Sequence, residues 1–128
     1  MNSTAYKQIN RYSDILVIMA SVGIDIVDNQ RVRKYISDSF IDKFLSETER
    51  EDYDALGTDD RKVEFIAGRI AAKEAVLKCL KTKDICTMKD IVIKEDVIGA
   101  PYVIYDGFDI QISISHEKLF SIAVAFYL

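Results

Sequence analysis

The sequence predicts a single α+β domain in which a small, antiparallel-rich sheet packs against one long central helix. One observation behind this prediction is a segment with helical periodicity over about five turns in the middle of the chain. Another is a pair of alternating apolar runs near the C-terminal end, a pattern typical of antiparallel strands. The chain has 128 residues, of which 49% are apolar and 30% are charged. This length is enough for one domain to fold without disulfide bonds.

The N-terminal third of this domain should consist of a strand followed by a helix. Residues 22–27 form a short apolar run rich in β-branched side chains, which predicts a buried strand ending near Asp25. Over residues 28–36 the pattern becomes helical, because Val32 and Ile36 lie four positions apart.

Further helices should fill the middle of the chain. We expect a short helix over residues 40–45, and Ser46 with Glu49 three positions later has the capping-box pattern that begins another. The longest periodic segment covers residues 61–81. Its apolar stripe consists of Val63, Ala67, Ile70 and Leu77.

After the long helix the period changes from helical to two residues. Residues 91–93 and 102–105 are predicted strands on either side of the turn at Gly99-Ala100-Pro101. Ile110, Ile112 and Ile114 then alternate with polar residues, and Ile122, Val124 and Phe126 repeat the alternation. These last two runs predict an antiparallel pair with one buried face.

The overall composition excludes several classes of protein. A formal net charge of −4 and a pI near 5.0 argue against a surface that holds nucleic acid, because such binding needs an excess of Lys and Arg. The apolar run over residues 15–27 is too short to span a bilayer. Cys79 and Cys86 lack the spacing of a metal or redox site. We therefore expect a cytoplasmic protein with reduced thiols and with neither a nucleic-acid nor a membrane partner.

Positive charge is concentrated in one segment of this acidic chain. Residues 61–83 contain seven basic and two acidic side chains, for a local net charge of +5, so the rest of the chain sums to −9. Such a band can attract a multiply charged anion, most commonly a phosphate. The alternative is a solvated helix face on which Glu74 and Lys78 form an ordinary i,i+4 pair.

Four residues in the long helix conflict with simple packing. Glu74 falls on the apolar stripe, where a carboxylate is costly unless it is paired or binds a metal. Arg69 and Lys73 lie four positions apart, so their repulsion would be relieved by an anion between them. Gly68 stands inside the helix, where glycine usually reflects a close approach by another group.

Two further polar residues lie in or at the end of predicted strands. Asp25 lies between Ile24 and Ile26, where it could cap the following helix or act as an oxygen ligand. Together with Glu74 it could hold Mg²⁺, with phosphate oxygens and water completing the octahedron. His116 follows an alternating run and is either structural or a donor to a phosphate.

These residues occur in an order that resembles a known family, the holo-(acyl-carrier-protein) synthases, which are small 4'-phosphopantetheinyl transferases of bacterial lipid synthesis. The resemblance covers residues 22–128. Its motifs are Gly23-Ile24-Asp25-Ile26-Val27 with Arg31-Val32, the string Glu64-Phe65-Ile66-Ala67-Gly68-Arg69-Ile70-Ala71-Ala72-Lys73-Glu74-Ala75 with Lys78, and Ile112-Ser113-Ile114-Ser115-His116.

The resemblance implies the 4'-phosphopantetheinyl transferase fold, assembled as a homotrimer with coenzyme A and Mg²⁺ bound between neighbouring subunits. The implied reaction, part of fatty acid biosynthesis, transfers phosphopantetheine from coenzyme A to a serine of apo acyl carrier protein. It releases adenosine 3',5'-bisphosphate. Residues 21–128 would form this domain, and residues 1–20 an N-terminal extension in which Met19 is a possible native start.

The resemblance also implies a role for individual residues. Asp25 and Glu74 match the metal ligands, and Lys78 matches a lysine that contacts the diphosphate. Glu74 and Lys78 are thus the expected catalytic residues, with Glu74 the leading candidate for the base. Arg69 and His116 match residues near the coenzyme A phosphates. Arg61 and Lys62 match basic residues directed toward the 3'-phosphate. Arg31 matches a helix arginine that meets the acidic carrier protein.

The sequence departs from the family pattern in ways that leave alternatives open. Ala100 replaces a lysine near the nucleotide, Glu117 replaces a hydroxyl residue after His116, and Asp38, Ser39 and Asp42 dilute the basic docking face. A non-catalytic coenzyme A or nucleotide-binding module would fit these departures. A Mg²⁺-dependent phosphohydrolase using the same carboxylates is a remoter alternative.

Overall fold

The computed structural model describes residues 8–9, 16–17, 20–82 and 87–127. The expectations for Met19, Lys83 and Cys86 fall outside this part of the chain. The elements are β1 (Gln8–Ile9), β2 (Leu16–Val17), β3 (Ser21–Asp28), α1 (Asn29–Tyr35), α2 (Asp38–Phe44), α3 (Glu47–Asp54), α4 (Asp59–Cys79), β4 (Val92–Glu95), β5 (Pro101–Ile104), β6 (Ile110–His116) and β7 (Phe120–Tyr127).

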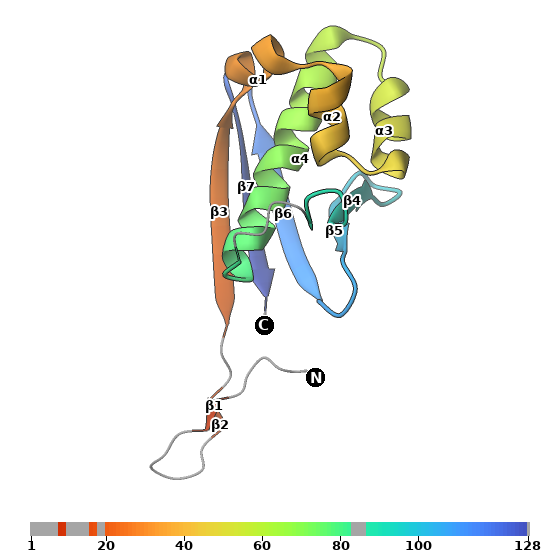
Figure 1. The fold of residues 1–128 in the computed structure, drawn as a ribbon. Coiled ribbons are helices and arrows are strands. Elements are labelled where there is room, and N and C mark those ends of the chain that lie inside the picture. Colours follow the sequence, from red (N-terminus) through yellow and green to blue (C-terminus); the bar gives the residue numbers. More distant parts are fainter. Residues whose placement is uncertain (1–7, 10–15, 18–19, 83–86, 128) are drawn as a thin grey trace.

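The main sheet has the strand order β3-β7-β6, and both pairings are antiparallel. Helix α4 lies along one face of this sheet, with α2 and α3 beside it (Figure 1). The β4–β5 hairpin lies near the lower end of α3 in this view. The short strands β1 and β2 pair with each other in a two-stranded sheet. This arrangement confirms the predicted α+β class and the long central helix.

Side chains cap the first turns of the helices, and the predicted capping box is confirmed. Ser46 accepts a hydrogen bond from the Glu49 backbone, and Glu49 accepts one from the Ser46 backbone, so the capping box begins α3 as expected. Thr58 caps α4. At α1, however, the cap is Asp28, whose carboxylate accepts from the Gln30 and Arg31 amides.

The expectation that the first strand ends near Asp25 is wrong. Strand β3 continues to Asp28, so Asp25 lies inside the strand, opposite Ala123 of β7. Because Asp28 provides the helix cap, capping does not account for Asp25. Asp25 is therefore a carboxylate placed in the middle of a strand, and its side chain is only 20% exposed.

Small residues on the inner face of the sheet let α4 approach closely. Ala123 and Ala125 of β7 are buried against α4, which contributes Ala71, Ala72 and Ala75 to the same core. Gly23 permits the closest approach, because a Cβ atom at this position would lie 2.0 Å from the Ala75 carbonyl oxygen. At Gly23 the strand and the helix therefore pack backbone against backbone.

The large apolar residues of β3 and β7 lie on the other face of the sheet, whereas the isoleucines of β6 pack against the core. Val22, Ile24 and Ile26 of β3 are 56–63% exposed, and Ile122 and Phe126 of β7 are about 40% exposed. The period-two pattern of β7 is confirmed, but its apolar set is not the buried one. Ser121, Ala123 and Ala125 face inward, since α4 leaves no room for larger side chains.

In the described part of the chain, no helix is both long enough and apolar enough to cross a membrane.

Candidate functional site

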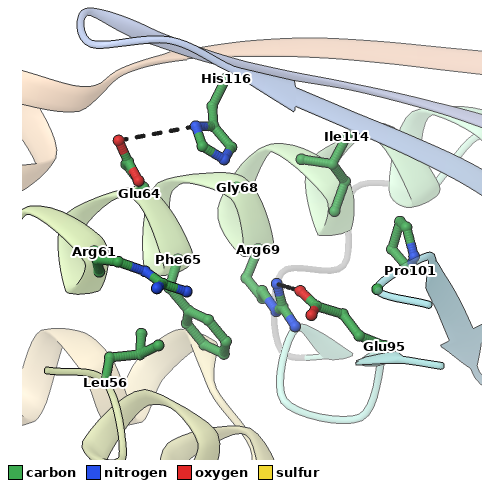
Figure 2. Close-up of a pocket in the computed structure, with 11 residues that line it drawn as sticks. Leu56, Arg61, Glu64, Phe65, Gly68, Arg69, Glu95, Pro101, Ile114 and His116 are labelled. Atoms are coloured by element: carbon green, nitrogen blue, oxygen red, sulfur yellow. Dashed lines mark hydrogen bonds and ion pairs between the residues drawn. The ribbon is translucent and has the colours of Figure 1, made fainter. Parts of the chain in front are cut away.

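A pocket of about 200 Å³ lies between α4, the β4–β5 hairpin and the end of β6; we call it the Arg69 pocket (Figure 2). Three of the predicted phosphate-binding residues, Arg61, Arg69 and His116, line it together. The other lining residues are Leu56, Glu64, Phe65, Gly68, Glu95, Gly99, Pro101 and Ile114.

Arg69 is almost completely buried in the wall of this pocket. Its guanidinium carbon lies 3.9 Å from the centroid of the Phe65 ring, and Nη1 lies 3.5 Å from Glu95 Oε2. Burial lowers the pKa of Arg69, and the Glu95 carboxylate is the strongest charge that opposes this change. The pocket therefore presents a desolvated cation held by a single weak ion pair.

The opposite end of the pocket is formed by residues of α4 and β6. His116 Nδ1 lies 3.9 Å from Glu64 Oε2, and both side chains are partly exposed. Gly68 forms the wall between them and Arg69 in Figure 2, and a Cβ there would lie 3.4 Å from Ile114 Cγ2. Because Gly68 has no side chain, only the helix backbone forms the pocket wall at this point. This role explains why a glycine occupies a helical position that is otherwise unfavourable for it.

A second, larger hollow of about 580 Å³ lies between β3, α1, α2 and α4; we call it the Asp25 groove. Asp25, Glu74 and Arg31 line it, together with Ile26, Val27, Asp28, Val32, Tyr35, Phe40, Phe44, Ile70 and Phe120. Burial raises the pKa of Glu74, the Asp25 charge raises it further, and Lys78 opposes both. The two carboxylates are thus close enough to repel each other.

Lys78 links α4 to β3 beside this groove. Its Nζ donates to Asp25 Oδ1 at 3.1 Å and to the Ile24 carbonyl oxygen at 2.9 Å. The ion-pair partner of Lys78 is therefore Asp25 rather than Glu74, the partner expected for a plain helix surface. Lys78 itself is more than half exposed, so its ammonium can also reach a ligand in solution.

The Asp25 groove has the donor set that Mg²⁺ uses. Mg²⁺ is bound through one or two carboxylates and keeps water or substrate phosphates in its other positions. Among the described residues no cluster of three or more His, Cys, Asp or Glu side chains could hold a metal ion. Two mutually repelling carboxylates fit a cation that shares its coordination with a phosphate substrate, and do not fit a closed structural site.

Comparison with known proteins agrees with this geometry. Residues 21–126 match the family model of the 4'-phosphopantetheinyl transferase superfamily. The holo-(acyl-carrier-protein) synthase of Acholeplasma laidlawii is 37% identical over 107 residues, which cover 80% of this chain and 91% of that protein. The corresponding synthase of a Geobacillus species is 40% identical over 113 residues, 83% of this chain and 93% of its own length.

A solved structure shares the fold as well. The holo-(acyl-carrier-protein) synthase of Bacillus anthracis, crystallised in complex with CoA (3',5'-ADP), has a TM-score of 0.78 to this chain at 35% identity. The match covers 84% of this chain and 94% of that one. The chain belongs to the holo-(acyl-carrier-protein) synthases. The resemblance noted in its motifs is thereby confirmed.

In this synthase, the expected band of positive charge is not one surface. A helix turns by about 100° per residue, so neighbouring cations point in different directions. Arg61 and Arg69 enter the Arg69 pocket, whereas Lys62 lies over the Tyr53 ring at 5.5 Å and does not line that pocket. The expectation of an anion between Arg69 and Lys73 is wrong, because Lys73 is fully buried and its Nζ contacts Glu49 Oε1 at 2.6 Å.

Some residues of the synthase site escaped the sequence analysis. Glu95, four residues before Gly99, belongs to no motif in the sequence, and only the fold brings it to Arg69. Glu64 and Phe65 belong to the helix motif, but their side chains carried no separate prediction. The departure at Glu117 has a structural explanation, since its carboxylate accepts a hydrogen bond from the Leu119 amide in the β6–β7 turn.

Proposed function

We propose that this chain transfers 4'-phosphopantetheine from coenzyme A to a serine hydroxyl of apo acyl carrier protein, releasing adenosine 3',5'-bisphosphate. The observation that carries the proposal is the family match over residues 21–126, joined to a pocket with two arginines and a histidine and to the Asp25–Glu74 carboxylate pair between β3 and α4. The relative from Bacillus anthracis was crystallised with coenzyme A, which supports the same substrate here. The proposal places the reaction in fatty acid biosynthesis and in the cytoplasm.

The transfer needs charge neutralisation and positioning more than covalent chemistry from the protein. Arg61, Arg69 and His116 would hold coenzyme A phosphates in the Arg69 pocket, with Lys62 as a weaker candidate because it lies over Tyr53. Lys78 would contact the diphosphate, since its exposed ammonium stands beside Asp25.

The carboxylates of the Asp25 groove would have two tasks. Asp25 and Glu74 would hold Mg²⁺, which when bound supplies positive charge to the diphosphate oxygens. Glu74 is the group that we assign to receive the serine proton. Its place beside Asp25 in the groove supports this role, because a base must lie within reach of the proton that it accepts.

We also propose that the synthase works as a homotrimer with active sites between subunits. The Arg69 pocket and the Asp25 groove share no lining residue within one chain. In the trimer, the Arg69 pocket of one subunit would lie next to the Asp25 groove of its neighbour. The exposed apolar outer face of the sheet supports such an assembly, because an uncovered patch of this kind is typical of a protein interface.

The acidic carrier protein would dock beside the Asp25 groove. Arg31 lies on α1, is exposed and lines that groove, so it can meet a carrier carboxylate close to the carboxylate pair. Asp38 and Asp42 lie on the next helix, which supports a weaker overall attraction to an acidic partner.

One assay tests the reaction. The chain is incubated with apo acyl carrier protein, coenzyme A and Mg²⁺, and the mass of the carrier protein is then measured by mass spectrometry. We expect a gain of one phosphopantetheine group on a serine, and strong loss of this gain for Asp25→Asn and Glu74→Gln. An unmodified carrier would reject the transferase. Coenzyme A binding without transfer would then indicate a binding module, whereas cleavage without an acceptor would indicate a phosphohydrolase.

A mixing experiment tests the shared site. Glu74→Gln and Arg69→Ala should each be inactive alone, because each lacks one half of the site. If the halves come from different subunits, refolding the two variants together restores part of the activity. If each chain carries a complete site, the mixture stays inactive.

A further inference from the structure

Glu95 places a negative charge inside the pocket proposed for coenzyme A phosphates. It is the last residue of β4, and Figure 2 shows its carboxylate pointing at the Arg69 guanidinium across the pocket. The side chain is 51% exposed, so it is free to move away from Arg69 without opening the core. Nothing in the proposed transfer reaction requires a carboxylate at this place.

The hydrogen bonds of Arg69 are incomplete although its side chain is only 6% exposed. Its contacts with Glu95 Oε2 and with the Ile93 carbonyl oxygen are both 3.5 Å long, at the weak limit of hydrogen bonding. Within the described residues, Arg69 Nε is the only buried side-chain nitrogen or oxygen without a partner. A buried guanidinium with a spare donor is suited to a stronger acceptor than the one it has.

The charges in the pocket are balanced before any ligand arrives. The lining contains two arginines, Arg61 and Arg69, and two glutamates, Glu64 and Glu95, and its fifth ionisable side chain is His116. The hairpin that carries Glu95 also carries Lys94, which lines the adjoining hollow, but its Nζ is already paired with Asp52 Oδ2 at 2.6 Å. A phosphate entering the pocket therefore meets Glu95 at close range, and the neighbouring hairpin cation, Lys94, is engaged by Asp52.

We propose that Glu95 is an internal competitor for Arg69: it occupies the guanidinium when the pocket is empty, and an incoming phosphate must displace it. Glu95 thereby sets the affinity for coenzyme A and for the bisphosphate product. This inference rests on the proposed function, because it takes the Arg69 pocket as the place of the ligand phosphates. It makes Glu95 an affinity-determining residue and gives it no part in the chemical step.

The proposal predicts an unusual gain of binding on removal of a charged side chain. Glu95→Gln keeps the size of the residue and removes its charge, so a ligand phosphate would no longer compete with a carboxylate. We expect coenzyme A and adenosine 3',5'-bisphosphate to bind about twofold to fivefold more tightly, the range for one partly exposed charge pair. The unliganded variant should melt at a slightly lower temperature, and the ligand should raise its melting temperature by more than it does for the wild type.

A matched control separates a local from a general effect of charge. Glu51 lies exposed on α3 and does not line the Arg69 pocket, so Glu51→Gln makes the same change in net charge elsewhere. Titration calorimetry with coenzyme A should show wild-type affinity for this control. Equal gains in both variants would assign the effect to net charge and overturn the proposal.

The remaining outcomes are also decisive. Unchanged or weaker binding by a folded Glu95→Gln variant would overturn the competitor role, and weaker binding would make Glu95 a positioning residue for Arg69. If the wild type itself binds no coenzyme A, the proposed function fails rather than the inference about Glu95.

Discussion

Lys73 and Glu49 form an ion pair that is completely closed to solvent. Lys73 Nζ also donates to the Met88 carbonyl oxygen at 2.9 Å, and Glu49 Oε2 accepts from the Ile93 amide at 2.9 Å. The pair therefore joins α3, α4 and the start of β4 inside the core. A lysine that looked available for a ligand is instead part of the structural framework.

Removing one member of this pair should destabilise the fold strongly. Lys73→Met leaves the Glu49 carboxylate buried without a cation, and such losses cost about 3–5 kcal/mol. Urea unfolding followed by circular dichroism measures the change. The matched control is Lys89→Met, which breaks the exposed pair with Asp42 and should cost less than about 1 kcal/mol. Similar losses in both variants would contradict the structural role of Lys73.

The two glycines in the sequence motifs should respond oppositely to alanine. Gly23→Ala should lower the free energy of unfolding by about 3 kcal/mol or more, because the new Cβ would overlap the α4 backbone. Gly68→Ala should leave stability unchanged or raise it by up to about 1 kcal/mol, since only an ordinary contact with Ile114 is added. Its methyl group would narrow the Arg69 pocket, so we expect weaker coenzyme A binding by calorimetry. Tight binding by Gly68→Ala would show that the ligand does not use this wall.

Glu74 should make stability depend on pH in the absence of metal. Its pKa is raised in the folded chain, chiefly by burial and then by Asp25, so the native state holds this proton more firmly than the unfolded state. Stability is then fully retained below the unfolded pKa and is lost as the pH rises through the folded pKa. Glu74→Gln should therefore be more stable than wild type at pH 7, by about 1 kcal/mol or less after allowing for solvent screening.

Two measurements check this prediction. In thermal melts without metal, the advantage of Glu74→Gln should disappear at about pH 4, near the ordinary carboxyl pKa. With excess Mg²⁺ at pH 7, the wild type should gain stability and the variant should gain less. A wild type that is indifferent to Mg²⁺ would argue against the proposed metal site.

The outer face of the sheet should control assembly. Ile24→Lys places a charge in the centre of the exposed apolar face, so the proposed trimer should dissociate to monomers with intact secondary structure. Light scattering coupled to gel filtration gives the mass. Val97→Lys is the control, because Val97 is fully exposed in the β4–β5 turn, away from this face. A wild type that is monomeric at micromolar concentration would refute the trimer.

Arg31 should affect one substrate and not the other. Arg31→Glu reverses a charge beside the Asp25 groove, so we expect about a tenfold or greater rise in KM for the acidic carrier protein. The Kd for coenzyme A should stay within about twofold, because Arg31 does not line the Arg69 pocket. If both constants change together, Arg31 supports the whole site and does not serve carrier docking alone.

Local patterns predicted most of the secondary structure. Capping residues such as Ser46 act on the nearest backbone amides, so their effect can be predicted from the sequence without knowledge of the fold. The same holds for the periodicity of α4 and the alternation in β6 and β7. The strand boundary at Asp25 failed because an Asp in an apolar run resembles a strand end, whereas this one faces a helix that carries Glu74 and Lys78.

By itself, the sequence determined the α+β class, the long helix and membership of the family, because these depend on residue order and local spacing. Only the tertiary structure decided which face of β7 is buried, since alternation specifies a period and not a phase. It also decided the partner of each charge: Lys73 meets Glu49 in the core, and Arg69 meets Glu95 in a pocket. The physical reason is that Coulomb attraction and burial depend on distances in space, and residues more than 20 positions apart become neighbours only when the chain folds.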